Sequence, residues 1–278
     1  MNAINVSGNA ILIYGFHCGT EGVAIPTLVS RFVAAFIIIK LLLKDKWTLH
    51  LKRTFRFNPD WSMIRKILSV GIPNGLENSM FQLGKVLVLS LVSTFGTYAI
   101  AANAVSNVIT LFSILPGQAI CLAVTTVIAR CVGAGDYEQA KYYNKKLILL
   151  THIGMAITIF IVFITLPFIL KVYNLSEAAS EATRHIIWFH GFCAILIWAE
   201  SFTLPATFRA CGDAKACMII STVSMWIFRV GASYILGKNL GLGVFGVWVA
   251  MIIDWAFRSL LFGIRYFSGK WKKHALVS

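Results

Sequence analysis

Residues Gly71–Lys85 read Gly-Ile-Pro-Asn-Gly-Leu-Glu-Asn-Ser-Met-Phe-Gln-Leu-Gly-Lys, and the apolar run Val-Leu-Val-Leu-Ser-Leu-Val follows at 86–92. A carboxylate, Glu77, and an ammonium, Lys85, therefore interrupt a stretch that is otherwise suited to lipid. Each charged side chain costs about 2.5–3.5 kcal/mol at the centre of a membrane helix on insertion scales, and such residues normally face a bundle interior or a watery cavity. We interpret this segment as part of the wall of a transport pathway.

The composition sets the class of protein. The chain has 278 residues, of which 58% are hydrophobic and 13% are charged, whereas a soluble domain has about 25% charged residues. Its apolar runs are continuous and about 20 residues long, the length that crosses a hydrocarbon core of about 30 Å as a helix. We therefore predict an all-α polytopic membrane protein.

Eight apolar segments divide the chain. They lie at about 3–16, 22–43, 67–92, 98–129, 147–170, 184–207, 216–237 and 244–267. The longest polar interruption, residues 45–65, separates a first part, 1–44, from a second, 66–278. This basic link alternates Lys and Arg with aromatic or aliphatic residues, so it is either a strap on an anionic membrane surface or an ordinary charged connection.

The net charge of +14 is sorted by loop. One side of the predicted membrane carries only Lys171, Arg184 and Lys238, while most other Lys and Arg residues fall in the loops and tail of the opposite side. This asymmetry places both termini in the cytoplasm of a multi-pass cell-membrane protein. Nucleic acid is not an expected partner, because membrane topology accounts for the charge.

Enzyme chemistry finds no support in the motifs. The six cysteines show no CxxC pairing and are expected to be free thiols, and the histidines show no metal-ligand spacing. Gly133-Ala-Gly135 lacks the GxxxxGK[ST] pattern of a phosphate-binding loop. We predict no enzyme, no metal site and no cofactor, and an ion gradient of protons or sodium as the energy source.

A pair of related turns indicates internal duplication. Gly19–Val23 and Gly243–Val247 both read GxxGV, and each follows a Tyr-containing apolar run and leads into a helix directed inward. Equal orientation predicts a parallel repeat of the kind found in transporters. On this basis, 66–278 is a complete six-helix half and 1–44 holds the last two helices of another, whose first four would precede Met1.

Four further motifs carry a resemblance to a known family. They are Gly71-Ile-Pro-Asn-Gly75, Phe95-Gly-Thr-Tyr-Ala-Ile-Ala-Ala-Asn-Ala104, Val132-Gly-Ala-Gly-Asp-Tyr-Glu-Gln-Ala140 and Phe208-Arg-Ala-Cys-Gly-Asp213. In this order and spacing the chain resembles the MATE family of multidrug and toxin extrusion transporters, in particular its bacterial DinF/NorM-like members. The resemblance implies two six-helix lobes around a central cavity and the exchange of organic cations for sodium or protons.

Three acids and one base are candidates for ion coupling. Glu77 and Asp254 are expected at similar depths on the first and last helices of the six-helix half, where they would converge on a bound cation. Alternatively, Lys85 or Arg229 neutralises them. Glu200 lies on the helix where sodium-coupled members of the resembled family place a coordinating acid.

Polar and aromatic residues on the same helices are candidates for the substrate cavity. Asn78, Gln82 and Asn103 supply neutral polar contacts there or join helices by hydrogen bonds worth about 0.6 kcal/mol each. Phe81 and Trp198 either stack on a cationic drug or face lipid. Pro116 and Gly117, in the middle of a long apolar segment, predict a helix break.

The sequence thus favours an ion-driven antiporter that exports cationic, amphiphilic drugs or toxins. Two alternatives stay open: a flippase for lipid-linked precursors, for which a more cationic cavity is expected, and an inactive truncated membrane protein. Because a transport pathway of this kind needs two lobes, we also expect a missing N-terminal lobe or a second copy of the chain as partner.

Overall fold

A computed structural model describes residues 1–44, 59–269 and 271 of the chain. Every regular element among these residues is a helix, and the chain divides into two compact units, Met1–Pro59 and Asp60–Ser278. Most of the predicted basic link lies outside the described residues, so its interpretation as a membrane strap stays a prediction.

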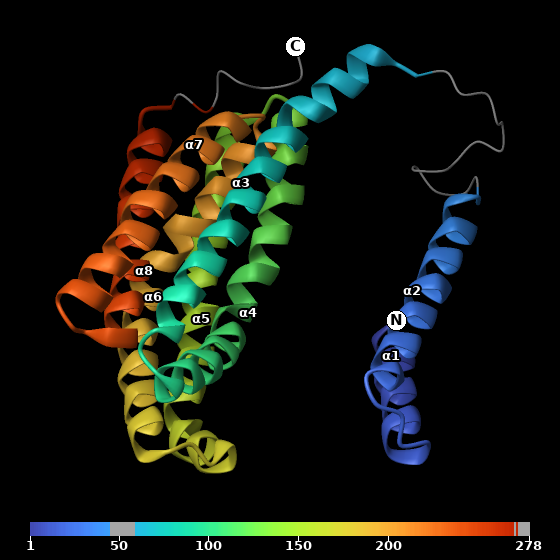
Figure 1. Cartoon of the computed structure of the whole chain (residues 1–278). Helices are drawn as coiled ribbons and strands as arrows, with labels where there is room; N and C mark the ends of the chain where they lie inside the picture. Colours follow the sequence, from blue (N-terminus) through green and yellow to red (C-terminus); the bar gives the residue numbers. More distant parts are fainter. Residues whose placement is uncertain (45–58, 270, 272–278) are drawn as a thin grey trace. The chain divides into compact units, whose positions relative to one another are not determined.

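The first unit is a helical hairpin (Figure 1). It contains α1 (Asn2–Ala10), a π-helical turn η1 (Ile11–Gly15) and α2 (Glu21–Leu42). The two helices approach closely where Gly8 faces Pro26, since a Cβ on Gly8 would lie 2.7 Å from the proline Cβ. The Asn5 side-chain amide also donates a hydrogen bond of 2.9 Å to Thr27 Oγ1.

The second unit is a bundle of long helices (Figure 1). Its elements are α3 (Trp61–Ser93), α4 (Thr97–Gly133), α5 (Tyr137–Tyr173), α6 (Glu177–Ala210), α7 (Ala214–Ser224), the π-helical segments η2 (Met225–Gly231) and η3 (Tyr234–Asn239), and α8 (Gly243–Phe267). Helix α4 packs on α5 and α6, α6 packs on α8, and α3 packs on α7 and η2.

Tight turns connect these helices. Gly135 and Gly212 follow α4 and α6 with φ of +76° and +86°, a left-handed conformation that glycine adopts without a steric penalty. The next helix begins at once, because the Asp136 carboxylate accepts a 2.8 Å hydrogen bond from the Gln139 backbone N–H. Two of the motifs quoted above are therefore the turns that hold neighbouring helices antiparallel.

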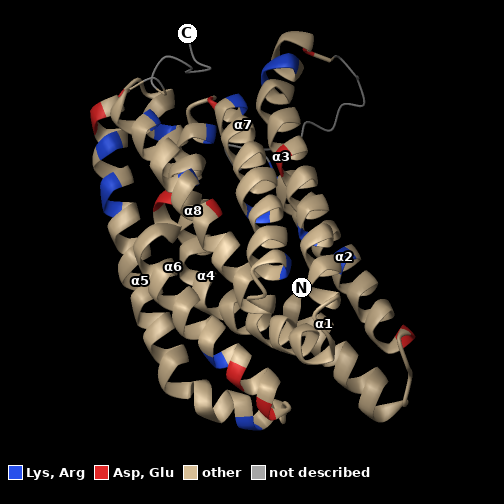
Figure 2. Ribbon diagram, turned by 60° about the vertical axis from the view of Figure 1, so that its left-hand side comes forward, with Lys and Arg blue, Asp and Glu red and all other residues tan. Residues whose placement is uncertain are grey.

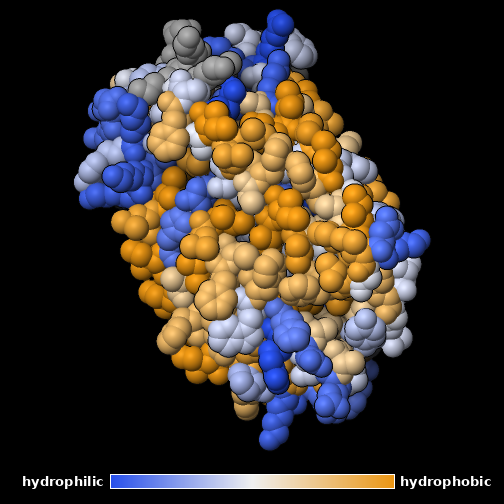
Figure 3. All heavy atoms as spheres, turned by 90° about the vertical axis from the view of Figure 1, so that its left-hand side faces the viewer, coloured by the Kyte–Doolittle hydropathy of each residue, from blue (hydrophilic) through white to orange (hydrophobic). Residues whose placement is uncertain are grey.

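In the part of the chain that the structure describes, six helical segments are long and apolar enough to cross a membrane: α2, α4, α5, α6, residues 214–239 and α8. Helix α3 is not among them, because the polar residues of its middle, Glu77, Gln82 and Lys85 among them, lower its mean hydropathy. Figure 3 shows a broad hydrophobic surface with hydrophilic residues at its two ends, and Figure 2 shows Lys and Arg gathered toward the ends of the helices. The prediction of an all-α, multi-pass membrane protein is confirmed.

The helices extend past the predicted apolar runs. Helix α3 begins at Trp61, where the Asp60 carboxylate accepts hydrogen bonds from the backbone N–H groups of Ser62 and Met63, and α5 begins about ten residues before its run. The 37 residues of α5 would measure about 55 Å, well beyond a hydrocarbon core of about 30 Å. Polar helix ends therefore project from the membrane, and hydropathy alone does not locate such ends.

The expected helix break at Pro116 and Gly117 is wrong. Helix α4 continues through both residues from Thr97 to Gly133. Gly117 serves helix packing instead: a Cβ there would lie 2.3 Å from the ring of Trp198 on α6, which is 2% exposed. A small residue at this position lets the two helices approach, as is usual in membrane bundles.

We expect replacement of Gly246 with alanine to destabilise the bundle. A Cβ at Gly246 on α8 would lie 2.8 Å from the backbone carbonyl of Leu236, and overpacking of this kind costs about 1–3 kcal/mol. Gly263→Ala is the matched control, because that glycine lies on the same helix with no atom within 4 Å of the added Cβ. Thermal unfolding in detergent should show a lower midpoint for Gly246→Ala only; equal midpoints would contradict the packing assigned to α8.

Candidate functional site

Two adjoining cavities lie within the second unit. Their volumes are about 550 and 230 Å³, and they share the lining residues Lys85, Asn107, Arg229, Trp248 and Met251. Together we call them the lobe cavity. Its walls come from α3, α4, α6, η2 and α8, so it forms only when these separate segments fold together.

One part of the lobe cavity is aromatic. Trp198 and Phe202 on α6 stack with ring centroids 5.0 Å apart, and Phe202 meets Trp255 of α8 edge-on at 5.4 Å. His190 contacts both Trp248 and Trp255 at 5.4 and 5.2 Å. Because Trp198 and Trp255 are nearly fully buried, these rings form a fixed apolar surface.

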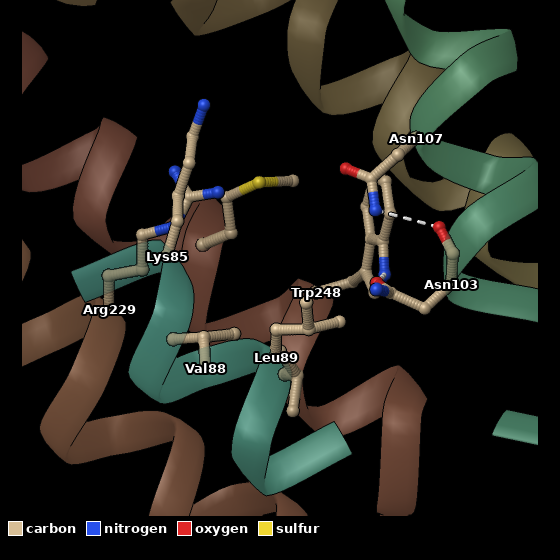
Figure 4. Close-up of a pocket in the computed structure, with 9 residues that line it drawn as sticks. Lys85, Val88, Leu89, Asn103, Asn107, Arg229 and Trp248 are labelled. Atoms are coloured by element: carbon tan, nitrogen blue, oxygen red, sulfur yellow. Dashed lines mark hydrogen bonds between the residues drawn. The ribbon is translucent and has the colours of Figure 1, made fainter. Parts of the chain in front are cut away.

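Neutral amides and cations lie on opposite sides of the smaller part of the cavity. In Figure 4, Lys85 and Arg229 lie along one side, while Asn103 and Asn107 of α4 lie on the other. The Trp248 indole N–H donates a 3.1 Å hydrogen bond to Asn103 Oδ1, and the Asn107 amide donates to the Asn103 carbonyl at 2.7 Å. The cavity thus presents both hydrogen-bonding and charged groups.

The charged residues that line the lobe cavity are all cations. Lys85 and Arg229 contact the same ring, that of Phe81, at 5.1 and 5.2 Å from its centroid, and Arg209 lines the larger part. Among the described residues, no Asp or Glu lines either part. Neither Lys85 nor Arg229 makes an ion pair within 4 Å in that part of the chain.

The predicted acids lie behind this lining. Glu77 accepts a hydrogen bond of 3.1 Å from Arg209, and the two side chains are 12% and 26% exposed. Asp254 is 0% exposed; Ser224 Oγ donates to its carboxylate at 2.5 Å, and Arg258 and Arg229 lie within electrostatic range. Arg209, and not Lys85 or Arg229, therefore pairs with Glu77, whereas Asp254 makes no ion pair within 4 Å among the described residues.

Glu200 has a different neighbour. Its carboxylate lies 2.9 Å from His152 Nε2 on α5, and His152 Nδ1 lies 2.6 Å from the carbonyl oxygen of Ile195. A carbonyl and a carboxylate both accept hydrogen bonds, and a neutral imidazole has only one N–H to donate. Both contacts therefore form as hydrogen bonds only if His152 carries a proton on each nitrogen or the carboxyl group of Glu200 is protonated. Glu200 does not line the lobe cavity.

The remaining candidates separate into two groups. Phe81, Asn103 and Trp198 line the lobe cavity, as expected of substrate-site residues, but their contact with a substrate stays a prediction. Asn78 and Gln82 are exposed and do not line it. The Asn78 amide donates instead to the Asn74 carbonyl of its own helix at 2.9 Å.

Several cavity residues were not predicted. Arg209 was assigned to an inner loop because it ends an apolar run, and Asn107 and His190 carry no pattern that separates them from packing residues. Arg229 was considered only as a neutralising neighbour, although it lies inside the apolar run 216–237. Treating every intramembrane charge as a functional candidate would have found it.

Comparisons with known proteins give one family. The MatE family model matches residues 73–235. The chain is 27% identical to the probable multidrug resistance protein NorM of Thermotoga maritima, covering 100% of this chain and 60% of that protein. It is 25% identical to the probable multidrug resistance protein YoeA of Bacillus subtilis, covering 99% and 60%.

A solved structure shows the same fold. An outward-facing multidrug resistance MATE family transporter of the MOP superfamily superposes with a TM-score of 0.87 at 20% identity, over 98% of this chain and 61% of that one. The chain therefore spans about 60% of the length of these relatives.

Proposed function

Because the chain belongs to the MatE family of multidrug and toxin extrusion transporters, we propose that it forms part of an ion-driven exporter of amphiphilic molecules. In this proposal, one lobe is residues 66–278, and the pathway opens alternately to the two sides of the membrane as the lobes move against each other. The second lobe comes from a longer protein or from another copy of the chain.

The lobe cavity is the single observation that supports this proposal best. Its larger part, about 550 Å³, falls within the range of about 300–1,000 Å³ that is usual for small-molecule sites. Rings of Trp198, Phe202 and Trp255 give it an apolar surface beside hydrogen-bonding amides and charges. Such a lining suits molecules that combine an apolar body with a polar group.

Glu77 is the carboxylate best placed to couple export to a proton or sodium gradient. It is partly buried, and its partner Arg209 lines the lobe cavity. A proton or sodium ion on Glu77 and a substrate on Arg209 would each break this pair, and exchange requires that the pathway reorients with only one of the two bound. The ion and the substrate would thereby act on the same pair.

The basic lining favours a second candidate within the same superfamily, a flippase for lipid-linked precursors. Such a substrate carries phosphate groups, which Lys85, Arg209 and Arg229 would attract. Cationic drugs, the substrate class expected from the sequence, would depend on Glu77, which is paired with Arg209, and on Asp254, which is fully buried with Arg258 and Arg229 in electrostatic range.

Transport in everted membrane vesicles tests the proposed function. Vesicles from cells producing the protein would receive fluorescent amphiphiles of both charges, and the proton and sodium gradients would be collapsed separately with an uncoupler or a sodium ionophore. We expect uptake by everted vesicles that stops when one of the two gradients is removed. Uptake equal to that of vesicles lacking the protein, or uptake indifferent to both gradients, would reject ion-driven export.

A further inference from the structure

Two of the three cations that line the lobe cavity, Lys85 and Arg229, make no ion pair within 4 Å among the described residues, whereas Arg209 is bonded to Glu77. Lys85 and Arg229 lie within 5.2 Å of the centroid of one ring and within electrostatic range of each other. Two like charges held close together repel, and the repulsion grows as the effective dielectric constant falls. An anion between them would relieve this repulsion.

The acids of the bundle do not supply that anion. Glu77 is bonded to Arg209, and Asp254 is fully buried and hydrogen-bonded to Ser224, with Arg258 within electrostatic range. The carboxylate of Glu200 is bonded to His152 and lies outside the cavity lining. The lobe cavity is thus a basic site bordered by acids that already have partners.

The arrangement of polar and apolar surface in the lobe cavity indicates which kind of anionic molecule would fit it. Lys85 and Arg229 lie across the smaller part of the cavity from Asn107 (Figure 4), whereas Trp198, Phe202 and Trp255 line its larger part on α6 and α8. An ammonium and a guanidinium both bind carboxylate and phosphate oxygens through charge-assisted hydrogen bonds. The aromatic rings match an apolar chain or ring system attached to such a group.

We propose that the lobe cavity binds an anionic amphiphile, with its carboxylate or phosphate between Lys85 and Arg229 and its apolar part against Trp198, Phe202 and Trp255. This inference rests on the proposed function in one respect, namely that the lobe cavity is the substrate site. It replaces the cationic substrates expected from the sequence by anionic ones.

Equilibrium binding in the absence of any gradient tests the inference. The protein would be placed in nanodiscs of zwitterionic phosphatidylcholine, with empty nanodiscs as background. Three dansyl probes would share one alkyl chain and end in a carboxylate, a phosphate monoester or a trimethylammonium group. Energy transfer from tryptophan to dansyl gives the Kd of each probe, because several tryptophans line the cavity.

We expect the two anionic probes to bind at least about tenfold more tightly than the trimethylammonium probe. Lys85→Gln and Arg229→Gln should each raise the Kd of the anionic probes about fivefold or more, whereas Lys85→Arg, which keeps the charge, should change it less than about twofold. Lys145→Gln is the matched control, because Lys145 is an exposed lysine on α5 that lines neither cavity.

Equal or tighter binding of the trimethylammonium probe would overturn the inference. So would an unchanged Kd for the anionic probes in both Lys85→Gln and Arg229→Gln, or the same loss in Lys145→Gln. Preferential anion binding without gradient-driven uptake would reject the proposed function alone. Gradient-driven uptake of the trimethylammonium probe, with no preference for anions, would reject this inference alone.

Competition identifies the source of the anion. Displacement of the phosphate probe by a polyprenyl phosphate incorporated in the nanodisc would support a lipid headgroup, and displacement only by a soluble alkyl phosphate would support a free amphiphile. Both results support the inference, whereas failure of both compounds to displace the probe would contradict it.

Discussion

Replacing Glu77 with glutamine should abolish ion-driven export, with initial rates at least about tenfold below those of the unchanged protein. Glutamine retains the shape of the side chain and its hydrogen bond to Arg209, but it cannot take up a proton and binds sodium poorly. The substitution therefore separates ion binding from packing. Initial rates of probe uptake by everted vesicles at matched protein levels provide the measurement.

A control variant and a binding measurement on Glu77→Gln complete this experiment. Glu181→Gln changes an exposed acid at the start of α6 and should export normally. In Glu77→Gln itself, the anionic probes should still bind in nanodiscs, because Arg209 keeps its charge and loses a competing carboxylate. Normal export by Glu77→Gln would remove Glu77 from the coupling mechanism.

Replacing Asp254 with asparagine should lower the free energy of unfolding by about 3–5 kcal/mol, the usual cost of leaving a buried charge, here that of Arg258, uncompensated. Asp254 is 0% exposed and Arg258 is 3% exposed, and Arg229 also interacts with this carboxylate. Without the carboxylate, Arg258 and Arg229 lose an anion that lies within electrostatic range of both. Thermal unfolding of the purified protein in detergent provides the measurement.

A double-variant cycle tests whether charge is the cause. Asp254→Asn combined with Arg258→Met should recover much of the lost stability, because methionine fills the space of the arginine stem without a charge. Asp136→Asn, a change at an exposed helix cap that asparagine also satisfies, should have little effect. If Asp254→Asn is as stable as the unchanged protein, the carboxylate does not balance the buried cations.

Composition and the length of the hydrophobic runs predicted the class of fold. Lipid around a helix disfavours charged residues, and the thickness of the hydrocarbon core sets the length of each apolar run. The apolar runs located the helices of the second unit, and the turns at Gly135 and Gly212 fall in motifs that the sequence displays. Polar helix ends, such as the first ten residues of α5, were missed because they leave the lipid. The break at Pro116 was also wrong: proline removes one backbone hydrogen bond, and packing around Gly117 and Trp198 keeps α4 continuous.

The candidate site was less predictable, because charge partners come from separate helices. The sequence indicates Glu77 as a candidate, but its partner Arg209 lies 132 residues away, and no local pattern connects the two. The sequence predicts that Asp254 converges with Glu77 on a cation; in the structure Asp254 is hydrogen-bonded to Ser224, with Arg258 and Arg229 within electrostatic range. The positive charge of the cavity lining therefore depends on contacts between distant helices, which the sequence does not display.

Substrate-driven movement of the coupling ion is the measurement that tests the central claim most directly. The protein would be reconstituted in proteoliposomes with equal proton and sodium concentrations on both sides, and a gradient of the anionic probe would then be imposed. Ion exchange predicts that protons or sodium ions move opposite to the probe and that Glu77→Gln stops this movement. Probe movement without any flux of either ion, or an equal ion flux in Glu77→Gln, would contradict the account.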